Sequence, residues 1–314
     1  MNLHEHQEEF AQLISLTAAY IGIPAAAVKR DYYIVMMMQN LQNSDFADKC
    51  VFKGGTSLSK CYPGSINRFS EDIDLTFIPV SDMSNKQCSR TLKKVEESIT
   101  DGFNIEKIES ERNDRNKSAY ILPKDDLQGD TRVKLEIGSS IRPDPYSVRE
   151  MKTYIQEYLE ANDMQDVINE FDLKPVSVYT LDITRTFLDK VMAVKRHACC
   201  GTLVNKVRHI YDVAALYKRA DIQEFLSDTA RLKPLLELTK ATDGFYLQKR
   251  NIAAGYDPTG PYAFDNWRDK LDKDIKRRYE TLHEDLLYTS EKQSFSIALD
   301  TFEKISNIFA AIDE

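Results

Sequence analysis

The sequence lacks long apolar runs, paired cysteines and clustered histidines. No stretch approaches the roughly 18 apolar residues of a membrane span, and the first dozen residues carry acidic side chains and no apolar core of signal-peptide length. We therefore expect a cytoplasmic protein with no membrane partner. The five cysteines and five histidines show no zinc-site spacing. The cysteines are expected to be reduced thiols.

The sequence also lacks an excess of basic residues. Its net charge of −8 argues against a uniformly basic surface that coats nucleic acid, but it allows a local basic groove or a basic partner. Hydrophobic residues make up 42% and charged residues 29%, which is typical of a globular chain. A length of 314 residues allows one large or two ordinary domains.

The most informative stretch covers residues 51–77 and reads VFKGGTSLSKCYPGSINRFSEDIDLTF. At Gly54 and Gly55 no side chain blocks a phosphate, and backbone N–H groups can face one. The residues from position 72 onward alternate as in a strand, so Asp72 and Asp74 project from one face, roughly 7 Å apart. Two carboxylates at that spacing can converge on one or two hard divalent cations.

The order of these features is more specific than any one of them. A strand, a GGTS turn, a short helix and then R-x-S-x-D-x-D on a following strand resemble the DNA polymerase β-like nucleotidyltransferase superfamily. The wording GGTSL…RFSEDIDL closely resembles the AbiEii/AbiGii toxin family of nucleotidyltransferases. The resemblance extends over about residues 25–220.

A third carboxylate lies on a later predicted strand. The segment RVKLEI at 132–137 alternates strictly, with Arg132, Lys134 and Glu136 on one face. Polymerase β-like enzymes often place a carboxylate on such a strand beside the metal pair, and Glu136 has the right type and context. The alternative is an exposed Glu136 that pairs with Lys134 or Arg132.

Two later helices carry a second motif group, K-x-x-A-x-x-R followed by R-x-x-Y-D. By pattern alone, Lys190 and Arg196 are solvated helix charges, and Arg208 and Asp212 form a surface ion pair. The resemblance instead implies a functional lysine and aspartate, which match Lys190 and Asp212. One departure is His209, where many relatives have an acidic residue.

The resemblance implies metal-assisted transfer of a nucleotide from an NTP, with Mg²⁺ (or Mn²⁺) as cofactor. The metal ligands would be Asp72, Asp74 and Glu136. The catalytic set would add Lys190 and Asp212. The nucleotide-binding residues would be Gly54, Gly55, Thr56, Ser57, Arg68, Ser70, Lys190, Arg196 and Arg208.

The expected fold is α+β. It comprises a nucleotidyltransferase domain over residues 1–220, with a mixed sheet flanked by helices, and a C-terminal helical bundle over residues 221–314. The resemblance implies a toxin of a type IV toxin–antitoxin or abortive infection system that modifies tRNA and has a separately encoded antitoxin. Two alternatives stay open: transfer to a protein or small-molecule hydroxyl, and a nucleotide-binding regulator that transfers nothing.

Helical periodicity predicts further elements whose limits the structure can test. One helix is predicted over 148–161, one from a Thr184 cap, and one from about 205. In the bundle, helices are predicted over 267–288 and 291–312. The basic ridge of the first of these, formed by Lys273, Lys276, Arg277 and Arg278, either meets RNA phosphates or is a solvated face.

Overall fold

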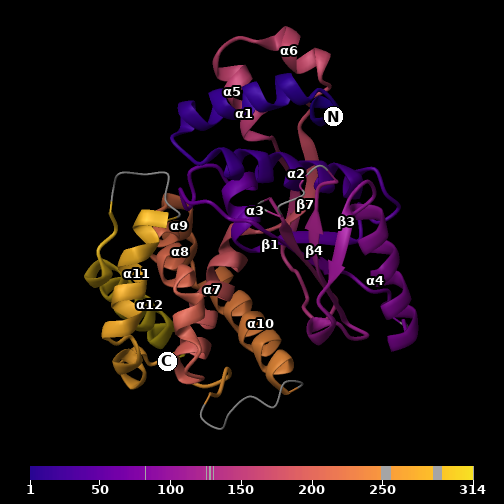
Figure 1. Cartoon of the computed structure of the whole chain (residues 1–314). Coiled ribbons are helices and arrows are strands. Elements are labelled where there is room, and N and C mark those ends of the chain that lie inside the picture. The colour runs from indigo at the N-terminus through magenta and orange to yellow at the C-terminus, as the bar shows by residue number, and fades with distance from the viewer. Residues whose placement is uncertain are drawn as a thin grey trace. The chain divides into compact units, whose positions relative to one another are not determined.

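The computed structural model describes residues 1–81, 83–124, 126, 129, 131–248, 256–285 and 292–313 (Figure 1). The chain divides into two compact units. The first comprises Met1–Cys61 and Phe69–Leu181, and the second comprises Tyr62–Arg68 and Asp182–Glu314. The domain boundary predicted after residue 220 stays a prediction.

The first unit is built on a seven-stranded mixed sheet with the strand order β3-β4-β5-β2-β1-β7-β6. The strands are β1 (Cys50–Lys53), β2 (Asp72–Phe77), β3 (Asn104–Lys107), β4 (Asn116–Leu122), β5 (Val133–Gly138), β6 (Tyr146–Met151) and β7 (Val176–Leu181). Strand β2 runs parallel to β5 and β1 runs parallel to β7, whereas the remaining neighbours are antiparallel. This mixed sheet confirms the predicted α+β class.

Alternation of side chains along β2 and β5 is as the sequence predicts. Ile73 and Leu75 on β2, and Val133 and Leu135 on β5, are buried, while the residues between them are partly exposed. One face of the central strands is therefore apolar, and the other face carries the polar residues of the candidate site.

Helices of the first unit pack against the sheet and against one another. They are α1 (Gln7–Ile21), α2 (Ala25–Gln42), α3 (Gly54–Cys61), α4 (Asn85–Ile99), α5 (Tyr154–Ala161) and α6 (Gln165–Glu170). Helix α4 packs on α2, β4 and β5, and α3 packs on β1 and β2 (Figure 1). Among the described residues no single helix is long and apolar enough to cross a membrane; α1 and α2, bent by 112°, pass that test only as a pair.

One predicted helix of the first unit is wrong over its first part. The segment expected to be helical over 148–161 begins as strand β6, which pairs antiparallel with β7 from Tyr146 to Met151. Helix α5 begins only after Thr153, whose hydroxyl accepts a hydrogen bond from the backbone N–H of Gln156 at 2.9 Å. Strand pairing therefore overrides the local helical periodicity.

The second unit is helical in its described part. Its helices are α7 (Ile183–Cys199), α8 (Arg208–Tyr217), α9 (Ala220–Ser227), α10 (Thr229–Gln248), α11 (Lys273–Asp285) and α12 (Phe295–Asp313), with short 3-10 turns at Leu203–Lys206, Phe264–Asn266 and Arg268–Lys270. Helix α8 packs against α7, α11 and α12, and α10 packs against α7. The rings of Tyr262, Phe264 and Trp267 stack edge to face in its core.

Several predicted helix limits in the second unit need correction. Asp182, rather than Thr184, caps α7, because its carboxylate accepts the N–H of Thr184 at 2.9 Å. Helices α8, α11 and α12 begin later than predicted, at 208, 273 and 295. Trp267 lies instead between the 3-10 turns Phe264–Asn266 and Arg268–Lys270, and its indole N–H donates to the carbonyl of Tyr262 at 3.0 Å. The predicted limits at 288 and 291 fall outside the described residues.

Candidate functional site

Gly54 is the junction of β1 and α3, and it is shaped by Asp74. Its φ of +87° lies in the left-handed region, which favours glycine. Lys53, the residue before it, is paired with Asp74 on the antiparallel strand β2. A Cβ at Gly54 would lie 3.2 Å from Cγ of Asp74 and closer still to its Oδ2. The absence of a side chain at Gly54 therefore gives the Asp74 carboxylate its place.

The predicted carboxylates lie on neighbouring parallel strands. Asp74 of β2 is in register with Glu136 of β5, and Asp72 is in register with Lys134. Ile73 and Leu75 on β2, and Val133, Leu135 and Ile137 on β5, alternate with these four residues and are buried, so the four share the other face of the sheet. The structure therefore brings Asp74 and Glu136 side by side; their role as metal ligands stays a prediction.

From the sequence, Lys134 was considered only as a possible ion-pair partner of Glu136. Its Nζ lies 2.6 Å from Oε1 of Glu136 and 2.8 Å from Oε2 of Glu111. Burial alone would lower the pKa of Lys134, but hydrogen bonds to Glu111 and Glu136 outweigh it and raise that pKa above its ordinary value. Strict alternation on 132–137 already placed Lys134 on the face of Glu136, and this signal could have identified it.

The donor set at this face fits a hard divalent cation. Carboxylate oxygens on adjacent strands suit Mg²⁺ or Mn²⁺, and Gly54 leaves room for the oxygen atoms of Asp74. Within the described part of the chain, no group of three or more histidine, cysteine, aspartate or glutamate side chains is arranged to hold a metal. This agrees with the position of the Glu136 carboxylate, which contacts the ammonium group of Lys134.

The hydroxyl groups predicted to contact phosphate are buried at the start of α3 and β2. Oγ1 of Thr56 lies 3.0 Å from Oγ of Ser70 and donates to the carbonyl of Asp72 at 2.5 Å. The hydroxyl of Ser57 donates to the carbonyl of Gly54 at 3.0 Å. These hydroxyls hold the glycine turn against β2, which leaves the first N–H groups of α3 as the better phosphate donors.

Asp212 is the centre of a buried ion cluster in the second unit. Its oxygens accept from Nε and Nη2 of Arg68 at 2.6 and 2.8 Å, and from Nζ of Lys190 at 2.7 Å. All three side chains are buried. Burial raises the pKa of Asp212, but the two cations outweigh it and hold that pKa well below its ordinary value. These three ionised side chains together carry two positive charges and one negative charge.

This cluster corrects two interpretations based on helix pattern alone. Lys190 is not a solvated charge, because it is 5% exposed. Asp212 is not part of a surface ion pair with Arg208, because it is fully buried and bound to Arg68 and Lys190. Both residues are held in a defined geometry, which a solvated helix face would not provide.

The remaining predicted residues of the second unit lie in other surroundings. Arg196 forms an ion pair with Asp243 of α10, whose second oxygen accepts from the hydroxyl of Tyr256 at 2.6 Å. Arg208 is the first residue of α8 and is half-buried. Desolvation, followed by the charge of Lys190, holds the pKa of His209 well below its ordinary value.

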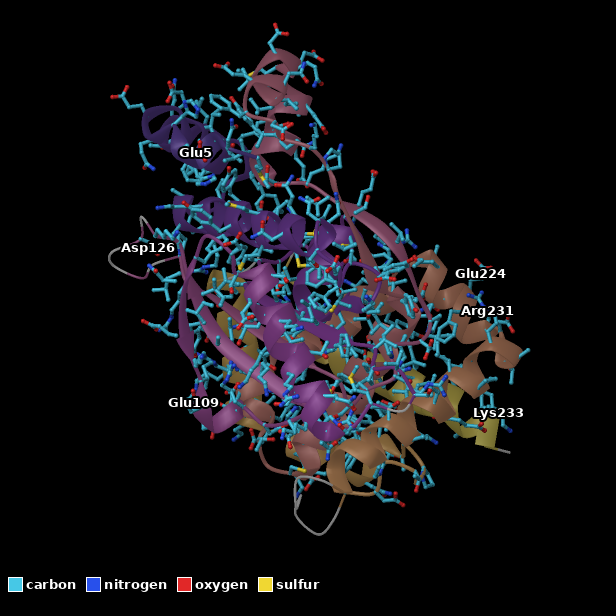
Figure 2. All side chains as sticks on the ribbon, turned by 90° about the vertical axis from the view of Figure 1, so that its right-hand side faces the viewer. Glu5, Glu109, Asp126, Glu224, Arg231 and Lys233 are labelled. Carbon is cyan, nitrogen blue, oxygen red and sulfur yellow. The ribbon has the colours of Figure 1, made fainter. Side chains whose placement is uncertain are left out.

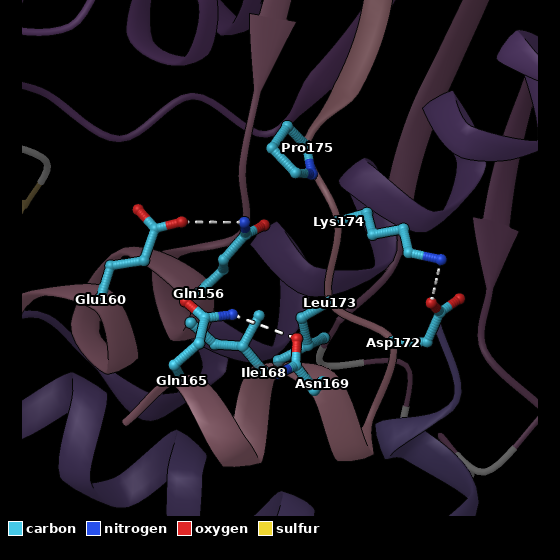
Figure 3. A pocket seen from close by; sticks show the side chains of 9 residues that line it. All are labelled: Gln156, Glu160, Gln165, Ile168, Asn169, Asp172, Leu173, Lys174 and Pro175. Atoms are coloured by element: carbon cyan, nitrogen blue, oxygen red, sulfur yellow. Dashed lines mark hydrogen bonds and ion pairs between the residues drawn. The ribbon is translucent and has the colours of Figure 1, made fainter. Parts of the chain in front are cut away.

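A separate cavity of about 370 Å³ lies in the first unit between α5, α6 and the segment before β7 (Figure 3). None of the predicted site residues lines it. Its acidic side chains are already paired: Glu160 with Gln156 and Lys152, and Asp172 with Lys174. The cavity therefore offers no free charge for a ligand among the residues that line it.

Comparison with known proteins gives the following relatives. A family model described as nucleotidyl transferase AbiEii toxin, type IV TA system, matches residues 36–301. The fold is similar to that of MenT4, the nucleotidyltransferase toxin Rv2826c from Mycobacterium tuberculosis H37Rv, with a TM-score of 0.51 at 16% identity over 95% of this chain and 98% of that one. JHP933 from Helicobacter pylori is matched with a TM-score of 0.38 at 18% identity, over 82% of this chain and 94% of that one. A comparison with curated proteins found no match.

Proposed function

Because the chain belongs to the nucleotidyl transferase AbiEii toxin family of type IV toxin–antitoxin systems, and is therefore a nucleotidyltransferase, we propose that it transfers a nucleoside monophosphate from an NTP to a hydroxyl of tRNA and releases pyrophosphate. The observation that carries the proposal is the close fit of Asp74 to Gly54, with Glu136 in register beside it. This fit brings the glycine turn and the carboxylate face together within one unit.

The first unit supplies the proposed metal and phosphate groups. Asp72, Asp74 and Glu136 would hold Mg²⁺ or Mn²⁺, which when bound would neutralise charge on the triphosphate and polarise the attacking hydroxyl. The backbone N–H groups at Gly54 and Gly55 would bind phosphate oxygens, as helix N-termini do. Thr56, Ser57 and Ser70 would support that turn through their hydrogen bonds.

The second unit supplies the proposed positive charge. Lys190 is a compact cation suited to phosphate, and Asp212 fixes the position of its ammonium group. Arg68 shares the same carboxylate, so two cations meet at Asp212. We propose that Arg196 and Arg208 contribute further positive charge toward the nucleotide. Such reactions depend on positioning and charge stabilisation, so few residues suffice.

Membership of a type IV family implies a separately encoded antitoxin as a partner. Transfer to a protein or small-molecule hydroxyl would use the same carboxylates and differ only in the acceptor. A regulator that transfers nothing is disfavoured, because a degenerate site would be expected to lose Asp72, Asp74 or Lys190, and all three are present.

Incubation of the purified protein with total tRNA, Mg²⁺ and each α-labelled NTP in turn tests the proposal. Label should enter tRNA with the wild type and not with Asp74→Ala. A matched control is Glu150→Ala, which removes an exposed carboxylate from the edge strand β6 and should leave labelling unchanged. Labelling of tRNA by Asp74→Ala at the wild-type rate would refute the assignment of the carboxylate face. Label that enters only protein or small molecules would refute the tRNA acceptor.

A further inference from the structure

Helix α4 carries a run of positive charge that the proposed reaction does not use. The segment 85–94 contains Lys86, Arg90, Lys93 and Lys94 and no acidic residue. All four side chains are exposed, whereas the opposite side of the helix is buried against α2 and the sheet. Figure 2 views the molecule from the side on which α4 lies. We call these four residues the α4 basic face.

The spacing of the α4 basic face is unfavourable for the helix itself. Lys86, Arg90 and Lys94 follow one another at intervals of four residues, and Lys93 lies three residues after Arg90, so they are neighbours on one face. Like charges at this spacing destabilise a helix. Lys86 also lies in the first turn, where the helix dipole disfavours a cation. In the described part of the chain, none of the four forms an ion pair with a carboxylate.

Neighbouring residues extend this positive region. Nε of Arg115 donates to Oδ1 of Asn85 at 3.0 Å, which holds a fifth cation at the start of α4. Nζ of Lys117 donates to Oγ of Ser89 at 3.1 Å. Burial first, and then the charges of Arg112 and Lys93, lower the pKa of Lys117. The region is therefore positive in a chain whose net charge is −8.

The basic ridge on α11 in the second unit differs from the α4 basic face. Arg277 pairs with Asp274 at 3.0 Å, and Lys276 lies 3.8 Å from Glu280. Two of the four cations of that ridge therefore have a carboxylate partner on their own helix, and Asp274 lies among them. On the α4 basic face none of the four cations has such a partner in the described part of the chain, so this face has more charge left for an external anion.

We propose that the α4 basic face is a docking surface for the phosphate backbone of the RNA acceptor. This proposal depends on the proposed function in one respect, namely that the acceptor is RNA. Successive cations are about 6 Å apart along the helix, and such a row can follow successive phosphates of one strand. Contacts of this kind bind RNA through shape and charge and without base specificity.

The test compares two variants with matched loss of charge. One replaces Lys86, Arg90, Lys93 and Lys94 by glutamine. The other replaces Lys273, Lys276, Arg277 and Arg278 of α11 by glutamine. Binding of tRNA to each is measured by fluorescence anisotropy between 50 and 200 mM KCl, with no NTP present. Each phosphate contact contributes about 0.7–0.9 to the slope of log K against log salt.

Loss of four contacts should therefore make the affinity of the α4 variant far less dependent on salt. Over this range the wild type should lose on the order of 100-fold more affinity than the α4 variant. The α11 variant should keep the wild-type slope. Removal of like charges from α4 should leave its melting temperature unchanged or higher, which separates a binding defect from misfolding. NTP binding should be unchanged in both variants.

Other outcomes overturn the proposal. Equal slopes in the wild type and the α4 variant would exclude α4 from RNA binding. Equal losses in both variants would indicate only a general effect of charge. Tighter binding of poly-glutamate than of tRNA by the α4 basic face would identify an acidic protein as its partner instead. Because RNA binding is measured without transfer, these results are independent of whether nucleotide transfer to tRNA is observed.

Discussion

Substitution of Gly54 by alanine separates the cost of backbone strain from the cost of moving a carboxylate. Gly54 and Gly102 both lie in the first unit and have nearly the same φ, +87° and +86°. A Cβ at Gly102 would meet nothing within 4 Å, whereas at Gly54 it would lie 3.2 Å from Cγ of Asp74. Gly102→Ala is therefore a matched control for Gly54→Ala.

The two variants should lose similar stability but different amounts of activity. Alanine in the left-handed region costs about 1–2 kcal/mol at either position. The atom nearest to a methyl group at Gly54 belongs to the side chain of Asp74, which can turn away at little cost to the fold. The carboxylate of Asp74 must then move by on the order of 1 Å, and a misplacement of that size lowers the reaction rate about 100-fold.

Urea unfolding and nucleotide transfer should be measured on the same two proteins. We expect free energies of unfolding that agree within about 1 kcal/mol, and transfer that falls about 100-fold in Gly54→Ala only. Equal transfer rates in the two variants would refute the argument that Gly54 exists to place Asp74. A much larger loss of stability in Gly54→Ala would show that the backbone, rather than the carboxylate, takes up the clash.

Three further predictions concern buried and desolvated charges. Asp212→Asn removes the buried carboxylate that Arg68 and Lys190 share, so urea unfolding should show a loss of about 3–5 kcal/mol. Lys60→Met should lower the free energy of unfolding by a similar amount at pH 7, because Nζ of Lys60 lies 2.8 Å from Oδ1 of Asp31 and both side chains are buried. At pH 5 this loss should be smaller, because the desolvated carboxylate of Asp31 can take up a proton. Burial, and then nearby cations, lower the pKa of His197 from 6.5 to about 4. As the pH drops from 6.5 to 4, His197 takes up a proton in the unfolded chain before it does so in the folded chain, so the stability of the fold should fall. The melting temperature of His197→Gln should fall less over the same pH range.

Exposed ion pairs provide the controls for these variants. Asp221→Asn breaks a surface pair with Arg219, and Lys152→Met breaks one with Glu160; each should cost less than about 1 kcal/mol. A loss in Asp212→Asn no greater than that in Asp221→Asn would contradict the buried cluster. For His197, a pH profile identical to that of the wild type would assign the acid sensitivity to other groups.

Local pattern was sufficient to predict the elements that the site depends on. Alternation identified β2 and β5, because the apolar face of each strand is buried and Asp72, Asp74, Lys134 and Glu136 on the other face are partly exposed. The α1 helix ends at Gly22, and α2 begins after Pro24, as glycine and proline chemistry predicts. Strand β6 could not be predicted in this way, since its partner β7 lies about 30 residues further along the chain.

The candidate site follows the same division between local and distant contacts. Alternation predicted that Asp72 and Asp74 share one face of their strand. The family resemblance predicted that Glu136 lies beside them. The partner that helical spacing alone predicted for Asp212 was wrong: it favours Arg208, four residues away. The observed partners are Lys190 and Arg68, and Arg68 is 144 residues away in sequence. Only the folded chain brings this arginine to the carboxylate.

The two interpretations of Glu136 that the sequence left open are compatible in the structure. Glu136 is in register with Asp74, as a metal ligand would be, and it also contacts Lys134 at 2.6 Å. Lys134 contacts Glu111 at 2.8 Å, so it keeps a carboxylate partner if Glu136 turns toward a cation. Neighbouring carboxylates repel one another unless a positive charge lies among them. A lysine in register with Asp72 supplies that charge from within the chain, which explains how a face this acidic is stable before any divalent ion binds.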